Sequence, residues 1–387
     1  MKRIAAVAGG ALFLVSCALV RGGLFDHHRY GDVALYGHYA HEMTSGHWPY
    51  RDFYDEYPVL AQPLFAFVRI LPGPFATSFK WLMAACGVGA IVLMVSMIRE
   101  SASRLSAAVA VAGLSPLLMG PVFLNTYDLF PALLTVAAVA AFVAGRERTT
   151  LVLLALAIAA KIYPIAIAPL VLYEAWTRGA LRRAVAWLAG VLVLVHLPFA
   201  VMGPGGLRFS YWLQVRRDLE SESLGGGILL VLDRLGIHSA TLRDQAPGSR
   251  DVVGGLAAAV GVISTLLVIA AIALVTWLYI RGGRDRVVAC AAAVAGFVAF
   301  AKVLSPQYLT WLVPLVPAAG IAEAGTLAVA LVLTHLEWDR FVDAHGSVDS
   351  WGRVLGPWIL VRDLVLVGLF ALLAFRLRAE ATLRSRR

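Results

Sequence analysis

Long apolar runs, separated by short charged segments, constrain this chain more than any other feature. A helix of about 20 apolar residues spans the roughly 30 Å hydrocarbon core of a bilayer. Runs near that length cover residues 4–20, 79–98, 184–202, 253–280 and 357–375. Hydrophobic residues make up 60% of the chain and charged residues only 15%, against roughly 25% charged in soluble domains. The sequence therefore predicts an all-α polytopic membrane protein that retains its first apolar run as a transmembrane helix.

The basic residues are clustered, and their positions predict which side of the membrane each loop faces. Short loops rich in Arg and Lys stay in the cytoplasm. The clusters are Lys2/Arg3, Arg99/Arg104, Arg146/Arg148, Arg178/Arg182/Arg183, Arg281/Arg284/Arg286 and the C-terminal tail. They account for the net charge of +9 and leave no soluble basic face for nucleic acid. We expect a multi-pass plasma-membrane protein with both termini in the cytoplasm.

Three long segments then fall on the extracytoplasmic side, at residues 21–58, 203–251 and 338–356. Most acidic residues lie there, and long loops are uncommon unless they are functional. In the first of them, residues 33–43 can form a short interfacial helix that carries Tyr36 and Tyr39, because aromatic residues favour the headgroup zone. Such a helix would hold the loop's carboxylates just above the bilayer.

Two spans look interrupted. Lys161-Ile162-Tyr163-Pro164 divides residues 149–176 into two short helices that form a hairpin, and Ser305-Pro306-Gln307-Tyr308 breaks the region after residue 287. Irregular backbone at membrane depth is tolerated where it lines a cavity. We expect one domain, residues 1–387, with about twelve transmembrane or half-spanning helices.

These features supply what sugar transfer from a lipid phosphate requires. A carboxylate or His must accept a proton from the attacking hydroxyl, and cations or other donors must hold the leaving phosphate. The first loop offers carboxylates, and isolated Lys161 and Lys302 stand at predicted helix ends. A lysine beside an apolar half-helix is costly and by default suggests function.

Motifs along most of the chain also resemble a known family. They are Asp32-x3-Tyr36, Gly46-x2-Pro49-Tyr50-x-Asp52-Phe53, Glu56-Tyr57-Pro58, Tyr127-Asp128-Leu129-Phe130-Pro131, Lys161-Ile162-Tyr163-Pro164, Arg217-Asp218-Leu219-Glu220-Ser221-Glu222, Lys302-Val303-Leu304-Ser305-Pro306-Gln307-Tyr308 and Arg362-Asp363-Leu364. Their order resembles glycosyltransferase family 87, a GT-C class family typified by polyprenol-phosphate-mannose-dependent α-mannosyltransferases. Val59 follows Pro58 where many relatives have a second proline.

The resemblance implies a GT-C fold and an inverting hexosyltransferase. Its donor would be a polyprenyl-phosphate sugar, mannose first among them, and its acceptor a membrane glycolipid or glycan. Asp32 matches the family's acid and would be the general base, with Glu56 as the alternative catalytic residue. The expected substrate-binding residues are Tyr36, Tyr50, Asp52, Asp128, Lys161, Tyr163, Arg217, Glu222, Lys302, Gln307, Tyr308 and His335.

Two further expectations complete the prediction. No cofactor is firmly indicated and structural-zinc ligand spacing is absent, although one or two carboxylates suffice to hold a divalent metal. The rival function is a transporter or a flippase for lipid-linked sugars, because broken helices and intramembrane charges also mark transporters. Those folds usually contain internal repeats, and the two halves of this sequence show no convincing match.

Overall fold

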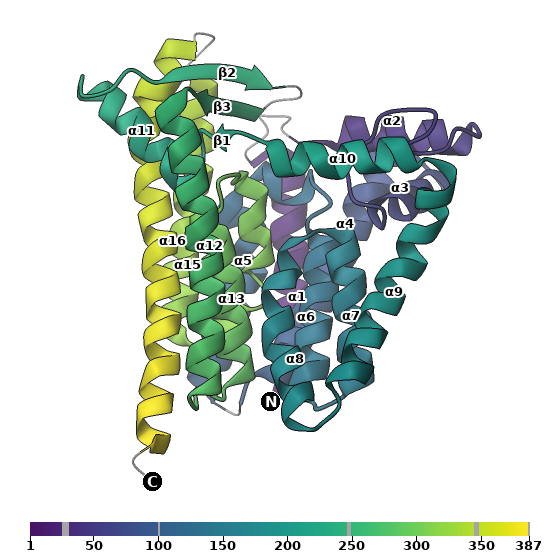
Figure 1. Cartoon of the computed structure of the whole chain (residues 1–387), viewed down its shortest axis with the longest axis vertical. Helices are drawn as coiled ribbons and strands as arrows, with labels where there is room; N and C mark the ends of the chain where they lie inside the picture. The colour runs from purple at the N-terminus through teal and green to yellow at the C-terminus, as the bar shows by residue number, and fades with distance from the viewer. Residues whose placement is uncertain (25–30, 100, 246–248, 344–347, 386–387) are drawn as a thin grey trace. The chain divides into compact units, whose positions relative to one another are not determined.

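The computed structural model describes the whole chain except residues 25–30, 100, 246–248, 344–347 and 386–387 (Figure 1). The chain divides into two compact units. Unit 1 contains residues 1–117 and 121–216, and unit 2 contains residues 118–120 and 217–387. Each unit is described by itself.

Unit 1 is built from helices. They are α1 (Lys2–Leu19), α2 (Val33–Thr44), α3 (Ala61–Ile70), α4 (Phe75–Met97), α5 (Ala102–Met119), α6 (Leu129–Val143), α7 (Glu147–Ala160), α8 (Ala168–Thr177), α9 (Leu181–Met202) and α10 (Pro204–Arg216). The short turns η1 (Val20–Leu24), η2 (Pro121–Leu124) and η3 (Tyr163–Ile167) connect some of them. In Figure 1, α2 and α10 run across one end of the upright helices of this unit. The short helix predicted at residues 33–43 is therefore present, as α2.

Small residues let the helices of unit 1 approach closely. The ring of Phe13 on α1 lies against Gly87 on α4, where an added Cβ would come within 2.2 Å of Phe13 Cζ. Such fits allow dense packing without a large side chain on both helices. Within the described residues, the free cysteines Cys17, Cys86 and Cys290 are all buried.

The interruption at Lys161 divides two short helices, as predicted. Lys161 has extended backbone angles (φ −163°, ψ 141°) and ends α7. Pro164 lies in the first turn of η3, a position at which the missing N–H costs nothing. Helix α8 then continues to Thr177. The second predicted break is also present, because α13 ends at Phe300 and η4 (Pro306–Trp311) follows.

Helix α9 is unusual among the long helices. Over its whole length, which the structure describes, Ala184 is the one buried residue. Large apolar side chains such as Val193 (62% exposed), Leu194 (68%) and Val201 (68%) point away from the protein interior. A helix with such a surface is compatible with a hydrocarbon environment rather than with water.

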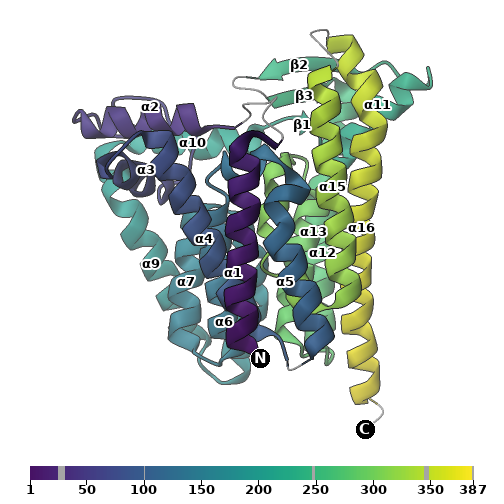
Figure 2. The same ribbon diagram turned by 180° about the vertical axis from the view of Figure 1, so that it is seen from behind.

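Unit 2 combines helices with a small sheet. The helices are α11 (Leu224–Arg234), α12 (Gly255–Ile280), α13 (Arg286–Phe300), α14 (Val316–Ala319), α15 (Ile321–Asp343) and α16 (Val348–Ser385). Strands β1 (Leu219–Glu220), β2 (Thr241–Gln245) and β3 (Ser249–Val253) form an antiparallel sheet in the order β1-β3-β2. Figure 2 shows this sheet and α11 at one end of α12, α15 and α16.

The sheet was not predicted, because its strands are short and charged and lack an apolar alternation. It is nevertheless anchored, since Leu219, Leu229, Val252 and Ala257 form a buried cluster between the strands and helices α11 and α12. Around residues 338–356, where a loop was expected, α15 continues to Asp343 and α16 begins at Val348. Of that expected loop, residues 344–347 lie outside the described part of the chain.

The membrane class is supported by helix length and composition. In the described residues, six helical segments are long and apolar enough to cross a bilayer: Lys2–Gly23, Phe75–Met97, Ala102–Met119, Leu181–Met202, Gly255–Ile280 and Val354–Leu383. Shorter apolar helices lie at Ala61–Ile70, Leu129–Val143 and Arg286–Phe300. The chain is thus an all-α polytopic membrane protein with a minor sheet, and the expected count of about twelve spans is not confirmed.

Candidate active site

Asp32 is held at the start of α2 by its own backbone. Its N–H donates to the carbonyl of Asn125 at 3.0 Å, and its carbonyl accepts from the N–H of Tyr36 at 2.9 Å. The preceding residue, Gly31, has φ +130°, and a Cβ there would lie 2.2 Å from the Asn125 Cβ. Glycine is therefore needed at this close approach, and the position of Asp32 is fixed relative to the segment before α6.

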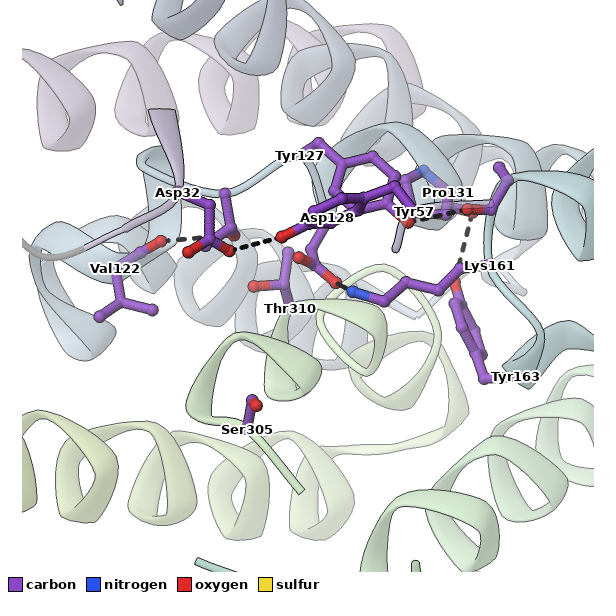
Figure 3. A network of polar contacts seen from close by, with 12 residues as sticks. Asp32, Tyr57, Val122, Tyr127, Asp128, Pro131, Lys161, Tyr163, Ser305 and Thr310 are labelled. Carbon is purple, nitrogen blue, oxygen red and sulfur yellow. Dashed lines mark hydrogen bonds and ion pairs between the residues drawn. The ribbon is translucent and has the colours of Figure 1, made fainter. Parts of the chain in front are cut away.

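Two tyrosine hydroxyls converge on the Asp32 carboxylate. Tyr57 donates to Oδ2 at 2.9 Å and Tyr36 donates to the same oxygen at 3.2 Å. The rings belong to one aromatic cluster, in which Tyr36 stacks on Phe65 with centroids 4.5 Å apart and Tyr57 meets Tyr127 edge-on at 5.3 Å. Figure 3 shows Tyr57 directed at Asp32. The carboxylate is thus surrounded by aromatic rings and oriented by two donors.

The surroundings shift the pKa of Asp32 upward. Burial raises it most, and the nearby charge of Asp128 raises it further. The hydrogen bonds from Tyr57 and Tyr36 and the charge of Lys161 lower it in part. A carboxylate with a raised pKa is a stronger proton acceptor than an ordinary aspartate.

A second charged group lies beside Asp32. Lys161 Nζ donates to Asp128 Oδ1 at 2.6 Å, and the ammonium also lies 4.9 Å from the centroid of the Tyr127 ring. The Asp128 side chain is 1% exposed and the Lys161 side chain 15%, so the pair is largely shielded from solvent. Tyr127 donates to the Ala160 carbonyl at 2.8 Å, which ties the end of α7 to this ring.

Tyr163, an expected substrate-binding residue, has its hydroxyl inside the protein. It is fully buried, donates to the Pro131 carbonyl at 3.2 Å and shares a 2.7 Å hydrogen bond with Thr135. These contacts join η3 to α6. Substrate binding by Tyr163 stays a prediction.

The remaining candidates of the first loop have different surroundings. Asp52 pairs with Arg51 at 2.8 Å and accepts from the Trp48 N–H at 2.6 Å, so it closes an exposed turn, and these contacts lower its pKa to about 2. Tyr50 is 5% exposed, and its hydroxyl donates to the Tyr57 carbonyl. Glu56 is partly buried, and its backbone carbonyl accepts from Gln214 at 3.3 Å.

In unit 2, the expected cations come together around β1. Arg217 pairs with Glu220 at 3.3 Å. Lys302 donates through Nζ to the Arg217 carbonyl at 2.6 Å, and its own carbonyl accepts from the Glu220 N–H at 2.9 Å. Burial lowers the pKa of Lys302. The break after α13 thus brings Lys302 next to the Arg217 motif, which is far away in sequence.

The Glu222 loop is fixed by a buried arginine on α16. Arg362 donates through Nη2 to the Glu222 carbonyl, through Nη1 to Glu337 at 2.7 Å and through Nε to Asp363 at 2.9 Å. Arg362 and Asp363 are fully buried. Burial and the neighbouring acids Glu337 and Glu220 raise the pKa of Glu222 well above its usual value.

The last three candidates also lie in unit 2. Tyr308 on η4 stacks on Trp311, with centroids 4.1 Å apart. His335 on α15 lies against Gly120, where an added Cβ would come within 3.0 Å of the imidazole. Gln307 is partly buried in η4. The structure thus places the expected residues in two groups, one in each unit.

Three residues that the sequence reasoning did not select stand out, two of them by burial and one by its contact with Asp32. Asp55 is 0% exposed, Tyr57 holds Asp32, and Asp251 on β3 is 0% exposed between Glu220 and Arg243 in the sheet register. Asp55 and Asp251 look in sequence like the other acids of their loops. Tyr57 was quoted in a motif, but its spacing of 25 residues from Asp32 gave no sign of the contact.

Within the described residues, no three His, Cys, Asp or Glu side chains are grouped so as to hold a metal ion.

Comparison with known proteins identifies the family. No curated protein matches the chain. The model of glycosyltransferase family 87 matches residues 56–306, which is more than half of the sequence. The matched part includes Asp128, Lys161, Arg217 and Lys302, and it begins after Asp32. The chain therefore belongs to glycosyltransferase family 87.

Proposed function

We propose that the protein transfers a hexose, mannose first among the candidates, from a polyprenyl phosphate to a glycolipid or glycan acceptor. The reaction takes place at the extracytoplasmic face of the plasma membrane, with inversion at the anomeric carbon. The family supports glycosyl transfer and gives no support to the rival function, a transporter or flippase. The observation that carries the finer proposal is the partly buried Asp32 carboxylate, oriented by two tyrosines beside an ion-paired lysine.

Asp32 acts as the general base in a single displacement. The acceptor hydroxyl oxygen forms a bond to the anomeric carbon while the bond from that carbon to the phosphate oxygen breaks. The bonding electrons leave with the polyprenyl phosphate, and the hydroxyl proton passes to Asp32. The raised pKa of Asp32 suits this role, because a base is most effective when its pKa approaches the working pH.

Lys161 binds the donor phosphate in this proposal. A lysine ammonium has three donor hydrogens, so a phosphate oxygen can share it with Asp128, which accepts at 2.6 Å. The 15% exposure of Lys161 leaves the ammonium within reach of a ligand. Asp128 keeps the cation in place before the donor arrives, which reduces the ordering that binding requires. Arg217 and Lys302 form a separate group of cations in unit 2.

The proposed orientation follows from the basic clusters. Arg146 lies in the turn between α6 and α7, and Arg178 lies in the turn between α8 and α9. Arg183, at the start of α9, pairs with Glu147 at 3.2 Å. Figure 1 shows these turns and the N-terminus at the end of unit 1 opposite α2 and α10. Since basic loops remain in the cytoplasm, the end with α2 and Asp32 faces outward.

The test uses the purified full-length protein in nanodiscs, with a panel of polyprenyl-phosphate sugars carrying a radiolabelled sugar and with extracted membrane glycolipids as acceptors. The wild type should consume one donor selectively. Asp32→Asn keeps the shape but cannot accept the proton, and it should lose about 10²–10⁴-fold in kcat. Glu42→Gln, a carboxylate change on the same helix with His47 as partner at 2.7 Å, is the matched control and should retain activity. Full activity of Asp32→Asn would refute the assignment of the base.

A further inference from the structure

Tyr57 is bound at three of its polar groups. Its hydroxyl donates to Asp32 at 2.9 Å. Its backbone N–H donates to Asp55 Oδ1 at 2.8 Å. Its carbonyl accepts from the Tyr50 hydroxyl and, at 3.4 Å, from Gln62 Nε2. A residue held on both sides of its backbone has little freedom to move its ring.

Asp55 is an unexpected partner for this backbone, because it is a carboxyl group with no exposure to solvent. Within the described part of the chain, its Oδ2 has no hydrogen-bond partner. Burial raises the pKa of Asp55 to about 7, and the charge of Glu56 adds to that shift, although hydrogen bonds from the Tyr57 N–H and from Gln62 oppose it. Burying a carboxyl group costs free energy that an apolar side chain of similar size would not cost, which indicates that the group has a role besides filling space.

Tyr50 is equally unusual, because it is the one non-glycine residue of the described chain with positive φ, at 66°. Such a conformation persists only where the surroundings impose it. Helix α10 provides them, since a Cβ at Gly206 would lie 1.9 Å from the Tyr50 carbonyl oxygen. The Tyr50 side chain packs with Val59, Ala159 and Leu207. Its hydroxyl is thereby aimed at Tyr57.

We propose that Asp55 and Tyr50 are positioning residues that hold Tyr57 so that its hydroxyl stays on the Asp32 carboxylate. The inference deepens the proposed function and rests on it, because it concerns the group that sets the strength of the general base. Neither residue touches the reacting atoms. The carboxyl of Asp55 serves as a hydrogen-bond acceptor, and its charge is not required.

The arrangement has a measurable consequence for the titration of Asp32. The groups that act on Asp32 are Tyr57 and Tyr36, which lower its pKa by hydrogen bonding, Lys161, which lowers it by charge, and Asp128, which raises it. The Tyr57 hydrogen bond is the largest of the lowering contributions. If Tyr57 moves away, the pKa of Asp32 rises. Removing the acceptor at Asp55 should therefore act like removing the Tyr57 hydroxyl itself.

A rival explanation is that Asp55 is the proton acceptor and Asp32 the support. The two explanations differ for Asp55→Asn. An asparagine side chain still presents an oxygen to the Tyr57 N–H, so a positioning role survives the change. A base does not survive it, because the amide cannot accept the proton.

The experiment labels the full-length protein in nanodiscs with dicyclohexylcarbodiimide, which reacts with protonated carboxyl groups in apolar surroundings, between about pH 4 and pH 9. Trypsin cleavage after Arg51 and Arg69 separates the Asp32 peptide, residues 30–51, from the Asp55 peptide, residues 52–69. Mass spectrometry then gives the pH midpoint of labelling at Asp32. The acid limb of the pH–kcat/KM profile, measured with the donor that the panel identifies, gives the same quantity from activity.

Tyr57→Phe and Asp55→Ala should both move the Asp32 midpoint upward by about one pH unit, the size expected for the loss of one hydrogen bond to a charged group. Asp55→Asn should restore the wild-type midpoint and keep kcat within about threefold. Tyr39→Phe is the matched control, because it removes a hydroxyl from the same aromatic cluster and should leave the midpoint unchanged.

Several results would overturn the proposal. An unshifted labelling midpoint of Asp32 in Tyr57→Phe or in Asp55→Ala contradicts it. A kcat of Asp55→Asn as low as the kcat of Asp32→Asn also contradicts it, because Asp55 would then be the base. If Asp55→Ala does not fold, Tyr50→Phe removes the other backbone contact and should give a smaller shift in the same direction, with no shift counting against the proposal. Activity in Asp32→Asn would refute the proposed function alone, because the labelling midpoints do not depend on turnover.

Discussion

Replacing Lys161 with methionine removes the cation of the Asp128–Lys161 pair while keeping a long, flexible side chain. Asp128 is 1% exposed and accepts from Lys161 at 2.6 Å, so the change leaves a charge in a shielded site. Breaking a buried pair by removing one partner costs about 3–5 kcal/mol. Lys161 is 15% exposed, and screening by solvent places the loss at the lower end, about 3 kcal/mol.

A double-mutant cycle with Asp128→Asn isolates the pair from the other contact of Lys161. The ammonium also lies 4.9 Å from the Tyr127 ring, and that contact is lost in Lys161→Met whether or not Asp128 is charged. The coupling energy between the two positions should be about 1–3 kcal/mol, so that the double variant is more stable than the sum of the single losses predicts. The measurement is unfolding of the detergent-solubilised protein followed by tryptophan fluorescence.

The same variants test the role of Lys161 toward the donor. Lys161→Met should raise the donor KM and lower kcat/KM by about 10–100-fold, the range for one lost hydrogen bond to a charged group. Lys161→Arg, which keeps the charge, should lose less. Additive stability changes with coupling below about 0.5 kcal/mol would refute the ion-pair reasoning, and an unchanged donor KM in Lys161→Met would refute the phosphate contact.

Three further predictions follow from other parts of unit 1. Gly206→Ala places a Cβ 1.9 Å from the Tyr50 carbonyl oxygen and should destabilise the protein by roughly 1–3 kcal/mol, whereas Gly205→Ala, with nothing within 4 Å, should not; equal unfolding temperatures would contradict this. Because the pKa of Asp55 is raised from 3.8 to about 7, the protonated form is favoured by folding, and its stabilising contribution is lost as the pH rises through 7. Asp55→Asn should lack that loss. The unfolding temperature of the variant minus that of the wild type should therefore increase as the pH is raised from about 4 to about 8. Finally, a cysteine at the exposed position Ser45, in a cysteine-free background, should react with an impermeant thiol reagent in intact cells, and labelling only after lysis would reverse the proposed orientation.

Much of the fold was predictable because a membrane imposes simple rules on sequence. The length of the apolar runs predicted the long helices. The Lys161–Pro164 segment predicted the break after α7, because proline and an intramembrane cation are strong local signals. The expected count of about twelve spans stays a prediction, because length alone does not separate a short spanning helix from a buried one. The sheet was not predicted, because its short strands are stabilised by contacts with α11 and α12, and no local sequence pattern reveals such contacts.

The site shows the same division. Asp32 and Lys161 were selected because a motif and an intramembrane charge are visible in sequence. Their partners Tyr57 and Asp128 depend on tertiary structure, at separations of 25 and 33 residues. Asp55 was overlooked because burial alone distinguishes it from Asp52, three residues earlier, and the burial of a loop residue depends on tertiary packing that no local pattern reveals.

Helix α9 has a consequence for how this protein changes over time and how it can be engineered. Ala184 is its one buried residue in the described chain. Its exposed side chains, such as Val193, Leu194 and Val201, are constrained by solubility in hydrocarbon, whereas Leu192, Val195 and Phe199 pack against the cluster around Tyr50. Leucine, isoleucine, valine and phenylalanine are nearly interchangeable by that criterion. The exposed face of the helix should therefore drift in sequence while keeping its hydropathy, and it offers positions where reporter side chains can be introduced without disturbing the neighbouring helices.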